Sequence, residues 1–186
     1  VSVVTDRIER FTETGIRLAS GAELPADLIV TATGLRMKFL GGLEVSVDGA
    51  RVELPRTTVY KGMMLTGVPN LAMTVGYTNA SWTLKCDLTC EYVCRVLNHM
   101  EPHDWRQCRP ELSDPTLRAE PLIGLSSGYV ERARSLFPTQ GSKRPWRLHQ
   151  NYLLDQLALR HARVDDGALR FSRAGSTAAG SESEAA

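Results

Sequence analysis

Apolar residues that alternate with polar ones, separated by turn residues, mark the first part of the chain as extended structure. Residues 8–12 and 16–19 flank Glu13-Thr14-Gly15, which predicts a β-hairpin. Alternating apolar positions on either side of Asp48-Gly49 predict a second hairpin. The amino-terminal third is therefore expected to consist of short strands and tight turns.

Three further apolar runs predict strands. Leu28 to Thr31 holds only apolar and β-branched residues, which is typical of a strand buried on both faces. That run ends at Ala32-Thr33-Gly34, where glycine permits a sharp exit of the backbone. Tyr60 to Leu65 and Leu71 to Val75 are expected to form two more strands, separated by a turn at Val68-Pro69-Asn70.

Helical spacing replaces alternation after Asn79. Residues 80–100 predict a long helix that Pro102 ends. Glu91 and Arg95 have the order that favours an i, i+4 ion pair on its surface. Five side chains at helical spacing are expected to form its buried stripe: Trp82, Cys86, Val93, Leu97 and Met100.

The remainder predicts fewer elements. Residues 101–125 are charged, proline-rich and without periodicity, so a surface connection is expected. Short helices are predicted over 128–136 and 151–162, and an extended piece over 167–171. The tail 174–186 is small and polar, a composition typical of disorder.

Composition narrows the function classes. The net charge is +1, with 22 basic and 21 acidic residues spread along the chain, so no nucleic-acid partner is expected. No apolar run approaches the roughly 18 residues that cross a bilayer, so no transmembrane segment is expected. The chain starts at Val1, inside a strand-like run, which suggests a truncated reading of a longer protein.

The cysteines and histidines offer little chemistry. Cys86, Cys90 and Cys94 are too widely spaced along a helix for one zinc ion, so small buried thiols in a reducing, cytoplasmic setting are expected, as for Cys108. His99 and His103 have helical metal-ligand spacing, but Pro102 interrupts it, and no metal site is expected. No catalytic residue is assigned in this chain.

The junction after the predicted strand 71–75 is the best candidate for a binding site. Gly76 leads into the start of the long helix, where free N–H groups and the positive end of the helix dipole meet. Thr78, Asn79 and Ser81 add polar partners, although Asn79 or Ser81 would equally serve as an ordinary helix cap. Trp82 could wall a substrate pocket or simply pack in the core, as expected of Trp105 and Trp146.

Several motifs resemble a known enzyme family. Asp27 to Gly34 is similar to the strand ending in Ala-Thr-Gly of flavoprotein monooxygenases with two dinucleotide-binding domains. The segments Tyr60-Lys61-Gly62, Gly67 to Ala72 and Val75 to Thr83 resemble the Baeyer–Villiger monooxygenases, in particular the ethionamide-activating type. The likeness continues, in the same order, through the following later segments: Gly128-Tyr129-Val130, Pro138, Gln140-Gly141, Pro145-Trp146-Arg147, Asn151-Tyr152, Asp165-Asp166-Gly167 and Leu169-Arg170-Phe171.

The resemblance implies an α/β fold, part of a Rossmann-like flavoprotein that binds FAD and NADPH. Residues 1–34 would end the NADPH-binding domain, 35–100 would form the carboxy-terminal part of the FAD-binding domain, and 101–173 would be a carboxy-terminal extension. In that family, NADPH reduces FAD, and the reduced flavin takes up O2 and transfers one oxygen atom to a ketone or to sulfur.

The resemblance also assigns site residues. Gly76, Tyr77, Thr78 and Asn79 would lie near the pyrimidine edge of the flavin. Ala32, Thr33 and Gly34 would line the passage between the two dinucleotide domains.

One departure limits what the chain is expected to do alone. It contains no G-x-G-x-x-G loop, so both FAD and NADPH would need an amino-terminal part of the same protein, which becomes its expected partner. The isolated chain is expected to be inactive. Three alternatives stay open: a flavin monooxygenase that oxidises only nitrogen or sulfur, a pyridine-nucleotide flavoprotein reductase, and a non-catalytic remnant or binding module.

Overall fold

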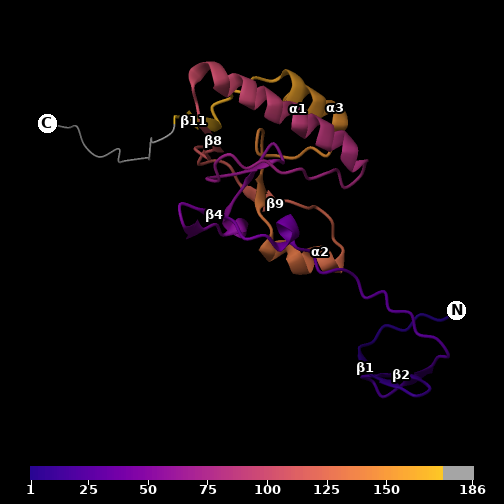
Figure 1. Ribbon diagram of the computed structural model, residues 1–186. Coiled ribbons are helices and arrows are strands. Elements are labelled where there is room, and N and C mark those ends of the chain that lie inside the picture. Colours follow the sequence, from indigo (N-terminus) through magenta and orange to yellow (C-terminus); the bar gives the residue numbers. More distant parts are fainter. Residues whose placement is uncertain (174–186) are drawn as a thin grey trace. The chain divides into compact units, whose positions relative to one another are not determined.

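The computed structural model describes residues 1–173, so the expected disorder of 174–186 falls outside the described residues. The chain divides into two compact units, Val1–Leu35 and Arg36–Ala186 (Figure 1). Helices and strands occur together, which agrees with the predicted α/β class. The strands are β1 Ile8–Thr12, β2 Gly15–Leu18, β3 Glu23–Pro25, β4 Ser46–Val47, β5 Ala50–Arg51, β6 Val59–Tyr60, β7 Met64–Leu65, β8 Gln107–Pro110, β9 Ala119–Pro121, β10 Thr139–Gly141 and β11 Leu169–Ser172. The α-helices are α1 Trp82–Met100, α2 Gly128–Ala133 and α3 Tyr152–Gln156.

The first unit is a three-stranded antiparallel sheet in the order β1-β2-β3. The predicted hairpin of β1 and β2 is confirmed. Gly15 is needed because a Cβ there would lie 2.0 Å from the carbonyl oxygen of Leu24 on β3. The predicted strand Leu28–Thr31 is wrong: the segment pairs with no strand, and Leu28 and Val30 are 82% and 80% exposed. Apolar, β-branched composition favours a strand, but a strand also needs a hydrogen-bonded neighbour.

Short hairpins also open the second unit. The predicted turn between β4 and β5 is confirmed, and Asp48 and Gly49 both have the positive φ that this turn type requires. The strand predicted over 60–65 is instead the hairpin β6–β7, because Lys61 and Gly62, with φ of 49° and 73°, reverse the chain. The predicted strand 71–75 is wrong: no ladder forms there, although the Met73 N–H donates to the Met63 carbonyl at 2.7 Å.

Residues 101–125 are more than the predicted surface connection. They contain β8, which pairs with β11, and β9, which pairs with β10. Both partners lie far away in sequence, so no local pattern reveals the pairing. The extended piece predicted over 167–171 is confirmed as β11. The predicted helices 128–136 and 151–162 are observed as α2 followed by the 3₁₀ turn Arg134–Leu136, and as α3 followed by the π-helical turn Leu157–His161.

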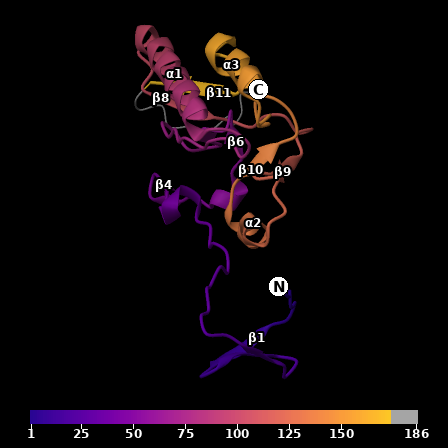
Figure 2. The same ribbon diagram turned by 90° about the vertical axis from the view of Figure 1, so that its right-hand side faces the viewer.

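The long helix is confirmed as α1, but its predicted buried stripe is only partly right: Met100 is buried and Val93 packs partly buried on the core. Trp82 and Leu97 are 59% and 58% exposed. The buried face consists instead of Lys85, Leu88, Thr89, Tyr92, Val96 and Met100. These positions also follow helical spacing. The spacing of apolar residues alone did not predict this face, because it includes a lysine and a threonine. In both views α3 lies beside α1, and the pair covers one side of the second unit (Figures 1 and 2).

The predicted ion pair between Glu91 and Arg95 does not form. Glu91 accepts two hydrogen bonds from Arg160, at 2.5 and 2.7 Å. Arg95 donates to the carbonyls of Leu159 and Ala162, at the end of the π-helical turn. Glu91 and Arg95 of α1 therefore both hold the segment that follows α3. Arg95 does so through carbonyls at the end of a helical turn, which lack helical partners and are good acceptors.

Tyr60 is fully buried at the centre of the larger core cluster. Its hydroxyl donates to Asp166 Oδ2 at 2.7 Å and lies 2.8 Å from the Tyr92 hydroxyl. Burial, with Tyr92 and Asp166 nearby, raises the pKa of Tyr60 above its ordinary value, so the phenol stays a donor.

We expect Tyr60→Phe to lower the free energy of unfolding by about 1–2 kcal/mol, because two hydrogen bonds are lost, one of them to a carboxylate. Urea denaturation followed by tryptophan fluorescence measures this. Tyr129→Phe is the control, since its hydroxyl has no recorded partner in the described chain. An equal effect of both substitutions would contradict the role assigned to Tyr60.

Candidate functional site

The junction singled out in the sequence, Gly76 to Trp82, lies at the amino-terminal end of α1. Gly76 and Tyr77 are buried, whereas Thr78 and Asn79 are exposed. The Trp82 ring packs directly on Gly76, since a Cβ added there would lie 2.1 Å from Trp82 Cγ. Gly76 thus permits an aromatic ring of α1 to rest on the preceding backbone.

Tyr77 points into the protein. Its hydroxyl donates to Asp155 Oδ2 on α3 at 2.7 Å. The Lys85 ammonium of α1 donates to the same oxygen at 2.9 Å, and the Lys85 and Asp155 side chains are only 4% and 12% exposed. Burial and the Asp155 carboxylate raise the pKa of Tyr77 above its ordinary value. A buried carboxylate with two donors therefore fixes the residue that follows Gly76.

Gln150 holds the next two residues. Its side-chain oxygen accepts from the Thr78 N–H at 2.9 Å and from the Thr78 hydroxyl at 3.3 Å. The Asn79 amide donates to the Gln150 carbonyl at 3.1 Å. Gln150 has a positive φ of 51°, and the following Asn151 caps α3 by accepting from the Leu154 N–H. The loop before α3 thereby fixes the loop before α1.

The start of α1 has no side-chain cap, contrary to the simplest expectation for Asn79 or Ser81. Ser81 occupies the cap position, but its hydroxyl lies 2.8 Å from the Thr83 hydroxyl and accepts no helix N–H. Asn79 is engaged with Gln150. The first N–H groups of a 19-residue helix consequently keep their hydrogen-bonding capacity and their positive end charge.

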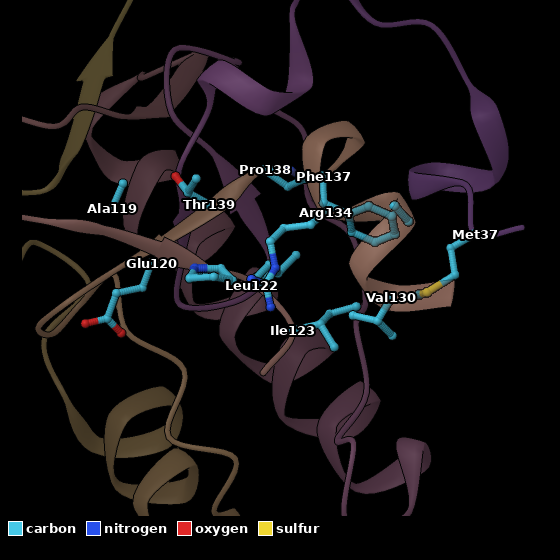
Figure 3. A pocket seen from close by; sticks show the side chains of 12 residues that line it. Met37, Ala119, Glu120, Leu122, Ile123, Val130, Arg134, Phe137, Pro138 and Thr139 are labelled. Carbon is cyan, nitrogen blue, oxygen red and sulfur yellow. The ribbon is translucent and has the colours of Figure 1, made fainter. Parts of the chain in front are cut away.

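One apolar cavity adjoins this junction, and a second shares part of its lining. The first, of about 330 Å³, is bordered by Gly76, Thr78 and Trp82. The other, of about 250 Å³, reaches Val130 on α2 and Arg134 in the 3₁₀ turn that follows it (Figure 3). In Figure 3 the Arg134 side chain extends toward Leu122, whereas the Glu120 carboxylate points away. The two cavities share four lining residues: Met37, Leu122, Ile123 and Phe137.

Not every predicted site residue belongs to the unit that contains the junction. Ala32, Thr33 and Gly34 are exposed residues of the first unit, without regular secondary structure. Trp105 and Trp146 pack in or against the larger core cluster, as expected, unlike the exposed Trp82.

The candidate metal ligands serve other purposes. His103 stacks on Trp105 with ring centroids 4.2 Å apart, and its Nδ1 lies 2.9 Å from the His99 carbonyl. Among residues 1–173 no cluster of three or more histidine, cysteine or acidic side chains has a geometry able to hold a metal ion.

The four cysteines are free, but the expectation that all are buried is wrong: Cys90 and Cys94 are exposed, and only Cys108 is fully buried. Within the described residues 1–173 no helix is long and apolar enough to span a membrane.

Lys85, Gln150 and Asp155 were missed as site residues. The clue for Lys85 was its position, in register with Leu88, Tyr92 and Val96 on the buried face of α1. A buried lysine needs a carboxylate partner. The sequence contains no local signal that selects Asp155, which is 70 residues further along the chain.

Known proteins similar to this chain are named as FAD-containing or FAD-binding monooxygenases. The chain is 52% identical over 173 residues to the FAD-containing monooxygenase EthA of Mycobacterium tuberculosis, and 49% identical over 171 residues to EthA of Mycolicibacterium smegmatis. These matches cover 93% and 92% of this chain but only 35% of each relative, so the chain spans about a third of their length. No protein-family model and no solved structure matches. The predicted resemblance to FAD-dependent monooxygenases is confirmed.

Proposed function

We propose that this relative of the FAD-containing monooxygenases is one part of an enzyme that uses NADPH, FAD and O2 to transfer one oxygen atom to a ketone or to sulfur, as Baeyer–Villiger monooxygenases do. The observation that carries the proposal is the uncapped start of α1, next to Gly76 and an apolar cavity. The identity to proteins named FAD-containing monooxygenases supports the use of FAD.

The residues at the junction fit one edge of a flavin. The free N–H groups in the first turn of α1 would donate to the ring oxygens, and the helix dipole would stabilise negative charge on the reduced ring. Tyr77 and Thr78, held by Asp155 and Gln150, would keep this backbone in place before the ring binds. When bound, FAD supplies the oxygen-transfer chemistry.

The substrate would approach from the apolar side. Trp82 borders the cavity of about 330 Å³ that adjoins the junction, and the cavity beside α2 continues it through shared residues. An apolar wall excludes water from the reacting atoms and favours a hydrophobic ketone or thio compound.

The remaining parts of the proposal concern the whole protein. Residues 1–34 would complete an NADPH-binding domain, 35–100 a Rossmann-like FAD-binding domain, and 101–173 an extension that packs on it, with the enzyme in the cytoplasm. The phosphate-binding glycine loops would come from an amino-terminal part of the protein, because this chain has none. By itself the chain would bind FAD weakly and lack activity.

A chimera tests the proposal. Residues 1–173 replace the equivalent third of Mycobacterium tuberculosis EthA, to which they are 52% identical. We expect the purified chimera to retain FAD and to oxidise NADPH in air when a cyclic ketone is added. The unaltered relative, prepared in parallel, is the control.

The outcomes separate the alternatives. A folded chimera without flavin would contradict the proposed role of the junction. Oxidation of a thioether but not of the ketone would favour the monooxygenase that oxidises only sulfur or nitrogen. Reduction of an artificial acceptor without substrate oxygenation would favour a reductase. A stoichiometric flavin on the isolated chain would contradict its proposed dependence on an amino-terminal part.

A further inference from the structure

A second kind of cavity is lined by both Lys85 and Asp155. It has a volume of about 320 Å³ and is bordered by the segment 144–149 and by residues around the π-helical turn 157–161. Unlike the apolar cavities, it is lined by five basic side chains: Lys61, Lys85, Arg144, Arg147 and Arg163. Only two carboxylates, Asp155 and Asp166, share the lining, so the cavity has an excess of three positive charges.

The carboxylates are already engaged by the two lysines. Lys85 pairs with Asp155 at 2.9 Å and Lys61 with Asp166 at 3.2 Å. In the described part of the chain, none of the three arginines pairs with a carboxylate. Arg147 donates to the Ser142 carbonyl at 3.3 Å, and Arg144 donates from Nε to His149 Nε2 at 3.0 Å. The excess charge is therefore borne by guanidinium groups free to bind an anion.

The two ammonium groups retain unused donors. The Lys61 and Lys85 side chains are only 7% and 4% exposed. An ammonium has three N–H donors, yet within residues 1–173 each of these two lysines contacts a single carboxylate oxygen. The rings of Tyr60 and Tyr92 lie 5.3 Å from the Lys61 nitrogen, and they attract the charge without accepting a conventional hydrogen bond. Buried donors of this kind normally find an acceptor.

The pKa shifts of His149 and Lys61 agree with an excess of positive charge in the cavity. Burial and the charges of Arg144 and Arg147 lower the pKa of His149, and only a neutral imidazole can accept the hydrogen bond from Arg144. Burial also lowers the pKa of Lys61, despite the opposing effect of Asp166. An anion in the cavity would reverse both shifts.

We propose that this cavity binds a phosphate or pyrophosphate group, held by Arg147 and Arg163 at its rim and by the ammonium groups of Lys61 and Lys85. Planar guanidinium groups match the geometry of phosphate oxygens and bind them in pairs of hydrogen bonds. The multiple negative charge of pyrophosphate matches the excess of three positive charges better than a monoanion does. The proposal is independent of the flavin-facing role of Gly76 to Asn79.

Calorimetric titration of the chain with inorganic pyrophosphate, at low and fixed ionic strength, tests the site. We expect saturable binding, and about tenfold weaker binding for Arg147→Gln and for Arg163→Gln, because each loses a charge-assisted hydrogen bond. Both arginines are exposed, so the fold should be retained. Arg132→Gln on α2 makes the same charge change outside the cavity and should leave the affinity unchanged within about twofold.

Two further measurements complete the test. A proton NMR titration should show the pKa of His149 rising when pyrophosphate is saturating. Competition by FAD, NADPH and NADH would identify the source of the phosphate, and binding of pyrophosphate alone would indicate a free anion. Absence of saturable binding, or an equal loss of affinity in Arg132→Gln, would overturn the proposal, because a merely basic surface attracts anions without regard to position.

Discussion

Replacing Asp155 with alanine is expected to lower the free energy of unfolding by about 3–5 kcal/mol. The substitution leaves the Lys85 ammonium charged and buried without its carboxylate, and it removes the acceptor of the Tyr77 hydroxyl. Urea denaturation followed by tryptophan fluorescence measures the change, since all three tryptophans belong to the second unit.

Two matched variants test whether the lost stability comes from the buried pair of Lys85 and Asp155. Glu91→Gln breaks the Glu91–Arg160 pair, whose side chains are 44% and 36% exposed, and should cost less than about 1 kcal/mol. The double variant Lys85→Met, Asp155→Leu removes both buried charges and should recover most of the loss. A cost for Asp155→Ala as small as that of Glu91→Gln would show that the buried pair does not hold α3 to α1.

Gly76→Ala is the second substitution with a large expected effect, about 1–3 kcal/mol of lost stability. The added methyl would lie 2.1–2.6 Å from three atoms of the Trp82 ring, so the ring and the first turn of α1 must move. Circular dichroism during urea denaturation measures the loss without relying on the fluorescence of Trp82.

A double-mutant cycle with Trp82→Ala isolates the cause. Once the ring is absent, the methyl group of Gly76→Ala has space, and at least half of its cost should disappear. Trp82→Ala alone should have a small effect because the side chain is 59% exposed. An unchanged cost of Gly76→Ala in the Trp82→Ala background would mean that the backbone conformation, rather than the ring, requires glycine.

Local chemistry made the turns and the long helix predictable. Asp48-Gly49 has the side chains that its turn demands, and the helical spacing after Ser81 marks α1. The strand Leu28–Thr31 failed because strands depend on partners, and within residues 1–173 this segment has none. The pairing of β8 with β11 was missed for the same reason, since about 60 residues separate them.

The candidate site was predictable only in part. The motif from Val75 to Thr83 identified the junction, and the resemblance to FAD-containing monooxygenases is confirmed by the relatives. Asp155 and Gln150 could not be selected, because contacts over 70 or more residues leave no spacing to recognise. The prediction that Trp82 belongs to the buried face of α1 was also wrong, because its ring packs on Gly76 and does not enter the core.

The single oxygen Asp155 Oδ2, shared by Tyr77 and Lys85, has a practical consequence for dividing the gene. A clone that stopped at residue 100 would contain the whole of α1 and the loop before it, yet it would lack Asp155 and Gln150, which bind Tyr77 and Thr78 of that loop. The part of the buried helix face that packs on later segments would meet water, and Lys85 would lose the carboxylate that it binds. Expression boundaries should therefore keep residues 36–173 in one piece.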